Sequence, residues 1–159
     1  YDSILSARVA VVLFFYELEI IVFYTGRSEV AIVSHSFGSM VTRYCITLGG
    51  CADKVSHWMS LAGADNGTSI ANLCAFQPSC QDMSGQTSTV ADLAAAWPAI
   101  TAQGVQVEVQ WSLDDGVILP ATNSPNPAPA VNVEVTPLTH NAIPDDPAVL
   151  DETLAFLGR

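Results

Sequence analysis

The segment Val30–Gly38, which has the sequence VAIVSHSFG, restricts the fold of this chain more than any other segment. Its first four residues are apolar, as in a short buried strand, and the residues after it have the spacing of an amphipathic helix. The pattern therefore predicts a strand, a sharp turn with Ser36 at its apex, and a helix. An ordinary strand-to-helix connection in which Ser36 caps the helix would give the same pattern.

Ser34 and Gly38 stand two positions before and after Ser36. A strained strand-to-helix turn that exposes a serine has small residues at its flanks, and we expect positions 34 and 38 to pass close together. The serine-x-serine-x-glycine pattern carries little information alone, because both residue types are common. The apolar strand before it and the helix after it make it informative.

The pattern of the whole chain predicts an α/β protein. We predict strands at residues 30–34, 57–61, 105–111 and 131–135, and helices at residues 6–24, 39–48, 89–97 and 147–157. Residues 6–24 are rich in β-branched and aromatic side chains, so a strand over part of this segment stays an alternative. Strands that alternate with helices or long crossovers indicate a mostly parallel sheet flanked by helices, in one domain over residues 1–159.

A polar segment at residues 63–88 is longer than a plain connection. Long loops of compact domains are often functional, and we interpret residues 63–100 as a lid or substrate-binding segment. Within it, Pro98 is expected to end the helix at 89–97, because proline cannot continue a helix interior.

The four cysteines indicate at least one disulfide. Cys74 and Cys80 lie in the polar segment, close enough to close a small loop, and this predicts a disulfide and an oxidising compartment. The roles of Cys45 and Cys51 stay open, because Cys45 lies in a predicted helix and would also suit a core position. No pattern of cysteine and histidine has the spacing of a zinc site, so no metal is expected.

The net charge of the chain is −11, and the residues after position 64 include eleven acids and one base. A surface this acidic repels phosphates, which argues against nucleic acid and anionic membranes as partners. The most apolar stretch, residues 9–24, is short for a bilayer and contains Glu17 and Glu19, so no membrane-spanning segment is predicted. No charged leader or cleavage site follows Tyr1, and we expect a mature or trimmed product.

A serine nucleophile needs a base, and the base needs an acid that orients it. Among the three histidines, His35 is adjacent to Ser36 on a turn and is expected to point away from it, and His57 begins a strand at its distant end. His140 follows the last predicted strand and precedes the final helix, where α/β-hydrolases have their base. We therefore predict His140 as the base.

The acid is expected in the loop after residues 105–111, which contains Asp114 and Asp115. The order Ser36, Asp115, His140 is the order of serine, acid and histidine in α/β-hydrolases. Spacing alone does not choose between the two aspartates.

Five segments together resemble the secreted bacterial triacylglycerol lipase/esterase family of α/β-hydrolases. Residues 28–44 resemble its elbow strand and helix, residues 49–55 and 60–68 the segment that follows, residues 111–120 the acid loop, and residues 138–140 the base loop. The resemblance implies an α/β-hydrolase fold, secretion, and a small-molecule or lipid ester as substrate. It also places the family's aspartate on Asp115, and it implies that the backbone N–H of Phe37 stabilises the oxyanion and that Phe37 and His35 line the substrate site.

Several positions depart from the family. Phe37 replaces its usual methionine, Ser39 its usual glycine and Asn66 a common histidine, and Asp114 stands where some members have a cysteine. The family's earlier strand and His-Gly loop, which supply a second oxyanion N–H, are not recognisable before Ser6. We therefore expect a small or N-terminally truncated version of the fold.

The sequence thus predicts a serine hydrolase that cleaves carboxylic esters through an acyl-enzyme, without cofactor or metal. One alternative is another enzyme with the same triad, such as an amidase, thioesterase or acyltransferase. The other is a catalytically weak or dead hydrolase that acts as a binding protein, which the unrecognised front segment favours. Neither the oligomeric state nor the acyl chain length is predicted.

Overall fold

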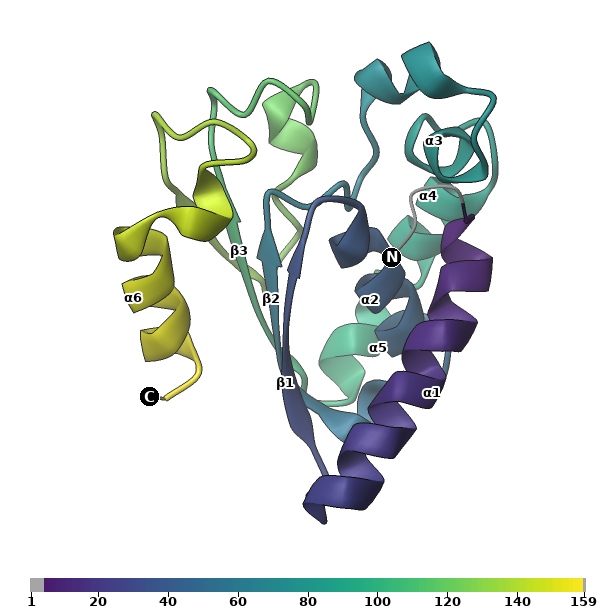
Figure 1. Ribbon diagram of the computed structural model, residues 1–159, viewed down its shortest axis with the longest axis vertical. Helices are drawn as coiled ribbons and strands as arrows, with labels where there is room; N and C mark the ends of the chain where they lie inside the picture. The colour runs from purple at the N-terminus through teal and green to yellow at the C-terminus, as the bar shows by residue number, and fades with distance from the viewer. Residues whose placement is uncertain (1–4, 159) are drawn as a thin grey trace.

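The computed structural model describes residues 5–158, in which four parallel strands form one sheet (Figure 1). The strands are β1 (Val30–His35), β2 (Val55–Leu61), β3 (Gln106–Trp111) and β4 (Val131–Glu134). They lie in sequence order, and each neighbouring pair is parallel. Their carboxyl ends therefore meet at one edge of the sheet, at the top of Figure 1. The predicted parallel sheet is confirmed.

Helices cover both faces of this sheet. On one face lie α1 (Ala7–Thr25), α2 (Phe37–Thr47), α4 (Thr89–Ala95) and α5 (Trp97–Ala102), and on the other lies α6 (Pro147–Phe156). The short helix α3 (Pro78–Met83) lies near the start of α1. Four 3-10 turns complete the fold: η1 (Ala52–Lys54), η2 (Ser69–Cys74), η3 (Ala121–Asn123) and η4 (Ile143–Asp145).

Two apolar clusters hold the layers together. The larger one joins α1, α2 and α5 to the sheet, and its fully buried members include Met40, Trp58 and Ile100. The smaller one lies between the sheet and α6 and is formed by Met59, Leu61, Ala62, Ile143 and Val149. Because the sheet buries apolar side chains on both faces, both helical layers contribute to its stability.

Helix α1 ends at Thr25, one residue beyond the predicted 6–24, and is followed by Gly26, which has a left-handed φ of 65° and donates its N–H to the carbonyl oxygen of Val22. This conformation favours glycine. The start of α1 is held differently: the N–H of Ala7 donates to Asp82 Oδ2 at 2.7 Å, and Asp82 belongs to α3. A long-range contact thus satisfies a helix terminus that the local sequence leaves open.

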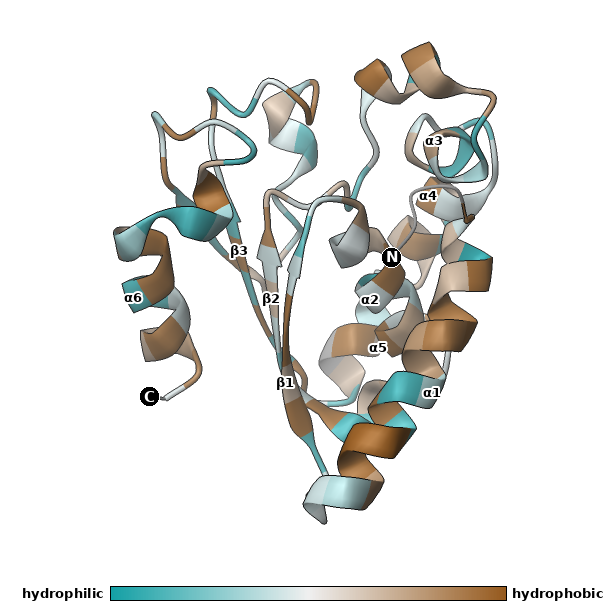
Figure 2. Cartoon of the chain, viewed as in Figure 1, coloured by the Kyte–Doolittle hydropathy of each residue, from teal (hydrophilic) through white to brown (hydrophobic). Residues whose placement is uncertain are grey.

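The outer side of α1 exposes many large apolar side chains, and much of the α1 ribbon is brown in Figure 2. They are Val9, Val12, Leu13, Tyr16, Ile20, Ile21, Phe23 and Tyr24. Even so, none of the helices among residues 5–158 combines the length and hydropathy that a bilayer crossing requires. Next to α1, β1 forms an edge of the sheet, since no strand precedes it in the described part of the chain.

The long segment after β2 contains two short elements between residues 63 and 88, η2 and α3. One prediction about this segment is wrong. Pro98 does not end a helix: α4 stops at Ala95, and Pro98 occupies the first turn of α5. Proline is tolerated there because the first N–H groups of a helix have no intrahelical acceptor.

Both cysteine pairs form disulfides, and no described cysteine is free. Cys74 pairs with Cys80, as predicted, and braces the turn between η2 and α3. Cys45 pairs with Cys51, which settles the question that the sequence left open and ties the end of α2 to the residues before β2.

Candidate active site

Ser36 lies on the sharp turn between β1 and α2. Its backbone φ is 55° and its ψ is −127°, a conformation that is strained for a residue with a side chain. Two hydrogen bonds to the end of β2 and the segment after it hold Ser36: its N–H donates to the carbonyl oxygen of Leu61, and Ala64 N–H donates to the carbonyl oxygen of Ser36, each at 3.1 Å. The predicted strand, turn and helix are thus present, with Ser36 at the apex.

We expected small residues at positions 34 and 38 because of crowding between them, but position 38 is not crowded in this structure. A Cβ atom added to Gly38 would meet no heavy atom within 4 Å. Ser34 has a polar role instead, because its buried hydroxyl accepts a hydrogen bond from Trp58 Nε1 at 3.0 Å and lies 3.2 Å from the carbonyl oxygen of Met59. It thereby joins β1 to β2 just before the turn.

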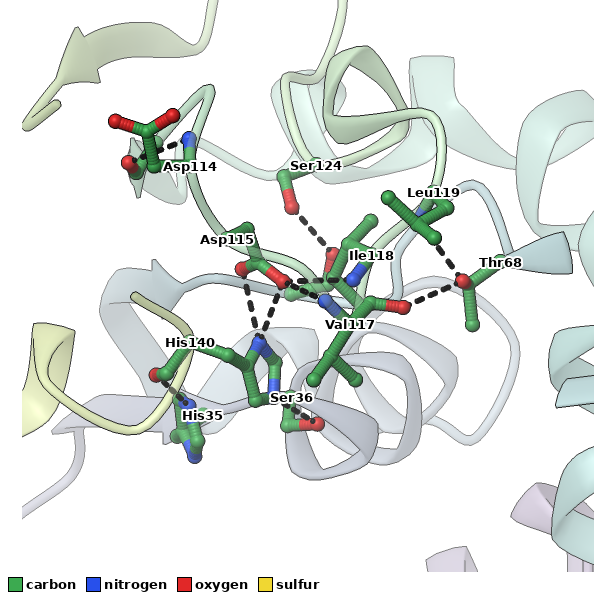
Figure 3. Close-up of polar contacts among 12 residues, drawn as sticks. His35, Ser36, Thr68, Asp114, Asp115, Val117, Ile118, Leu119, Ser124 and His140 are labelled. Carbon is green, nitrogen blue, oxygen red and sulfur yellow. Dashed lines mark hydrogen bonds and ion pairs between the residues drawn. The ribbon is translucent and has the colours of Figure 1, made fainter. Parts of the chain in front are cut away.

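A continuous chain of hydrogen bonds runs from Ser36 to an aspartate (Figure 3). His140 Nε2 lies 2.9 Å from Ser36 Oγ, and His140 Nδ1 lies 2.8 Å from Asp115 Oδ2. His140 and Asp115 are buried, with exposed fractions of 5% and 3%. With Nδ1–H donating to the carboxylate, Nε2 is free to accept the Ser36 proton. The structure thus brings together the three side chains that the sequence singled out.

Asp115 is held by its own loop. Its Oδ1 accepts hydrogen bonds from the N–H groups of Val117 at 2.8 Å and Ile118 at 2.6 Å. Burial raises the pKa of Asp115, but the hydrogen bonds from His140, Ile118 and Val117 outweigh burial and leave the pKa below its ordinary value. The carboxylate is therefore ionised at neutral pH and able to stabilise an imidazolium.

Asp114, which spacing did not distinguish from Asp115, points elsewhere. Its side chain is exposed, and its backbone N–H donates to Ser112 Oγ at 3.1 Å. In Figure 3 the Asp114 carboxylate lies away from His140. Of the two aspartates, Asp115 alone contacts the histidine.

Thr68 ties the acid loop to the segment after β2, and the sequence reasoning missed it. Its hydroxyl donates to the carbonyl oxygen of Val117 at 2.7 Å and accepts from the N–H of Leu119 at 2.9 Å (Figure 3). A single side chain thus holds the backbone of Val117 and Leu119, on either side of Ile118, in the loop that donates hydrogen bonds to Asp115. No local sequence pattern marks a threonine for such a long-range contact.

His35 contacts His140 rather than Ser36. Its Nε2–H donates to the backbone carbonyl oxygen of His140 at 3.1 Å, and the two ring centroids lie 4.6 Å apart. Burial lowers the pKa of His35, and the neighbouring His140 lowers it further. His35 is therefore neutral at physiological pH.

Phe37 is the first residue of α2, so its N–H is one of the helix-terminal donors that have no intrahelical acceptor. None of the hydrogen bonds within residues 5–158 uses this N–H. The Phe37 side chain is half-buried and packs against the larger apolar cluster. Its position next to Ser36 suits an oxyanion donor, while its role in substrate binding stays a prediction.

Arg43, a buried cation next to the site, was not predicted from the sequence either. Arg43 of α2 donates to the carbonyl oxygens of Asp65 and Leu93 and to Asn126 Oδ1, each at 2.9 Å. Its guanidinium carbon lies 4.9 Å from the centroid of Trp97. Burial lowers the pKa of Arg43 and raises that of Asp65, and their opposite charges counteract both shifts. Arg43 thus joins α2, the helix after Ser36, to three other segments.

The parallel sheet, the strand-to-helix turn and the flanking helices define an α/β-hydrolase fold. The chain belongs to the Lipase (class 2) family, whose model matches residues 16–148. No curated protein matches the sequence. The resemblance stated from the sequence is thus confirmed at the level of the family.

Solved structures of bacterial proteins, a lipase among them, share the fold. Bacillus licheniformis lipase BlEst2 in its propeptide form superposes with a TM-score of 0.78 and 16% identity, over 96% of this chain and 40% of that chain. The mature form of the same lipase superposes with a TM-score of 0.68 and 15% identity, over 81% of this chain and 66% of that chain. The lin2722 product of Listeria innocua superposes with a TM-score of 0.69 and 14% identity, over 96% of this chain and 67% of that chain. The chain thus spans 40% of the first relative and about two thirds of the other two.

Proposed function

We propose that this protein is a serine hydrolase of carboxylic esters, with Ser36 as nucleophile, His140 as base and Asp115 as orienting acid. The observation that carries the proposal is the unbroken chain of hydrogen bonds from Ser36 Oγ through both nitrogens of His140 to Asp115. Membership of a lipase family and the likeness to bacterial lipases support an ester as substrate.

The reaction follows from this geometry. Ser36 Oγ attacks the ester carbonyl carbon while His140 Nε2 takes the hydroxyl proton, and Asp115 stabilises the imidazolium that forms. The tetrahedral intermediate then expels the alcohol, which takes the proton from His140 and leaves an acyl group on Ser36. Water, activated by the same histidine, releases the acid. The N–H of Phe37 stabilises the oxyanion in both halves.

We further propose that the described segment 63–100 contributes to the substrate site, with Phe37 and His35 at its floor. The two disulfides suit an oxidising compartment, and we propose that the protein is secreted. Residues 1–159 are proposed to act as one domain.

A fluorophosphonate probe tests the proposal. We expect a covalent adduct on Ser36 in the folded protein, located by mass spectrometry, and no adduct in Ser36→Ala. Asp114→Asn is a matched control, because this exposed carboxylate lies outside the site and its variant should label like the wild type. Absence of an adduct in folded wild-type protein would reject the enzyme and favour a binding protein.

Esters, amides and thioesters with one common acyl group then separate the reaction classes. The proposal expects fastest turnover of the ester. A preference for the amide or thioester would reject the ester assignment while keeping the triad.

A further inference from the structure

The segment after β2 carries two large apolar side chains in water. Leu73 and Phe76 are 82% and 80% exposed. They lie in residues 66–81, here called the apical loop, which comprises the turn η2, the start of α3 and their connection. In Figure 1 this loop is the teal segment at the top, at the end of the molecule where the strands have their carboxyl ends, and Figure 2 shows apolar residues on it.

The apical loop is ordered by its own contacts, so its apolar side chains are held outward. The Cys74–Cys80 disulfide closes it. Gln81 Nε2 donates to the carbonyl oxygen of Ala75 at 2.9 Å, and Gln77 N–H donates to the carbonyl oxygen of Cys74 at 2.8 Å. The loop thus keeps two large apolar side chains exposed at a defined place, as in sites that contact an apolar partner.

The charge distribution points to the partner. The chain has a net charge of −11, yet residues 66–81 contain no charged side chain. Asp65 and Asp82, which flank the loop, are both buried. A loop without charge enters an apolar phase without the cost of desolvating an ion, whereas the acidic remainder of the protein disfavours an anionic surface.

The apical loop is also joined to the acid of the proposed site. Thr68, near its beginning, is hydrogen-bonded to Val117 and Leu119, and Ser69 N–H donates to the carbonyl oxygen of Leu119 at 2.9 Å. Val117 in turn donates to Asp115. Docking through this loop would therefore place an ester-bearing surface beside the reactive groups rather than on a remote flank.

We propose that Leu73 and Phe76 anchor the protein on the surface of an uncharged lipid aggregate, with the apical loop as the docking element. This inference rests on the proposed ester hydrolase and names the physical form of its substrate: lipid at a water interface. The apolar outer side of α1 is not the anchor, because its most exposed residues, Phe23 and Tyr24, belong to the last turn of α1, and that end of the helix lies far from the apical loop in Figure 1.

The test uses the Ser36→Ala protein, so that no lipid is hydrolysed, and sucrose-loaded vesicles of phosphatidylcholine. We expect co-sedimentation, and a partition coefficient at least about tenfold lower after Leu73→Ser with Phe76→Ser, since each apolar side chain contributes about tenfold or more when buried. Phe23→Ser with Tyr24→Ser is the matched control, because those side chains are 80% and 81% exposed. It should change binding less than twofold.

Three results would overturn the proposal: no binding of the parent protein to phosphatidylcholine, unchanged binding of the apical-loop variant, or an equal loss in the control. Vesicles that are half phosphatidylglycerol should bind more weakly, because the protein is acidic. A folding defect is excluded with a second variant, Phe76→Trp, which keeps an apolar side chain. Its fluorescence should be quenched by brominated phosphatidylcholine, and an unquenched signal would also reject insertion.

Hydrolysis of a short, water-soluble p-nitrophenyl ester keeps the two proposals separate. The readout for the apical-loop variant with an intact Ser36 is the ratio of two activities: its loss on emulsified triacylglycerol should exceed its loss on this soluble ester at least about tenfold. A parent protein that binds vesicles through the loop but cleaves no ester would refute the hydrolase alone. One that cleaves the soluble ester without binding vesicles would refute the docking alone.

Discussion

His35 donates a hydrogen bond from Nε2 to the backbone carbonyl oxygen of His140 at 3.1 Å, and the two imidazole rings lie 4.6 Å apart. The residue before the proposed nucleophile thus holds the loop of the proposed base. Since Ser36 and His140 are 104 positions apart in the sequence, this contact joins two distant segments directly beside the 2.9 Å bond between their side chains.

Replacing His35 by Phe should keep the ring and remove the donor. We expect kcat for a soluble ester to fall about tenfold, the equivalent of one hydrogen bond of about 1.4 kcal/mol, with little change in KM. His35→Asn, whose amide can donate, should recover part of the loss. The phenylalanine ring keeps the proposed apolar contact with substrate, so a change in KM with kcat unchanged would contradict the positioning role of His35.

The pH dependence of stability should also report His35. Burial and His140 lower its pKa below the ordinary 6.5, so the unfolded chain takes up this proton before the folded one. The contribution of neutral His35 to the stability of the folded protein is therefore complete above pH 6.5 and is lost as the pH falls through the folded-state pKa. The Tm of wild type should therefore drop further than that of His35→Phe between about pH 7.5 and about pH 5, as measured by calorimetry. Equal drops would contradict the lowered pKa.

Asp115→Asn should preserve the fold and remove the charge that stabilises the imidazolium. We expect kcat to fall by about 10³–10⁴-fold, because an amide can also hold the wrong tautomer of His140. Asp114→Asn should stay within twofold of wild type, since that carboxylate is exposed. Steady-state kinetics on one soluble ester compares them, and similar losses in both variants would contradict the assignment of the acid.

Thr68→Val should leave the carbonyl of Val117 and the N–H of Leu119 without their partner. We expect the free energy of unfolding to fall by about 1–3 kcal/mol and kcat to fall with it, because the backbone that holds Asp115 loosens. Thr68→Ser retains the hydroxyl and should behave like wild type in urea denaturation. A destabilised serine variant would instead point to the methyl group.

Gly63 and Gly38 give a paired test of backbone space. A Cβ at Gly63 would collide with Ser60 Oγ and lie 2.6 Å from Asp65 Oδ2, whereas one at Gly38 would meet nothing within 4 Å. Gly63→Ala should therefore destabilise the protein by about 1–3 kcal/mol. Gly38→Ala, in the first turn of α2, should be neutral or stabilising by up to about 1 kcal/mol. Thermal unfolding of both variants measures this, and the reverse order would refute it.

The architecture was predictable from local patterns. Apolar runs such as Val30–Val33 have few alternatives to a buried strand, and the order of serine, aspartate and histidine limited the proposed site to a handful of side chains. The choice between Asp114 and Asp115 needed either the family resemblance or the structure, because adjacent residues on a turn point in different directions.

The rest depends on contacts that a local pattern does not encode. Arg43 is buried because segments far apart in the chain supply its acceptors, and Thr68 matters because the acid loop lies against it. Pro98 was misplaced because the same residue suits a helix start as well as a helix stop. Gly38 was misjudged because the turn at Ser36 leaves it more room than expected.

The sequential order of the strands has a consequence for synthesis of the protein. Ser36 follows β1, Asp115 follows β3 and His140 follows β4, so the groups emerge from the ribosome in that order. A nascent chain that ends before residue 140 carries the serine and the carboxylate without the proposed base. The proposed site would thus stay incomplete until β4 and the loop after it have been synthesised and have joined the fold.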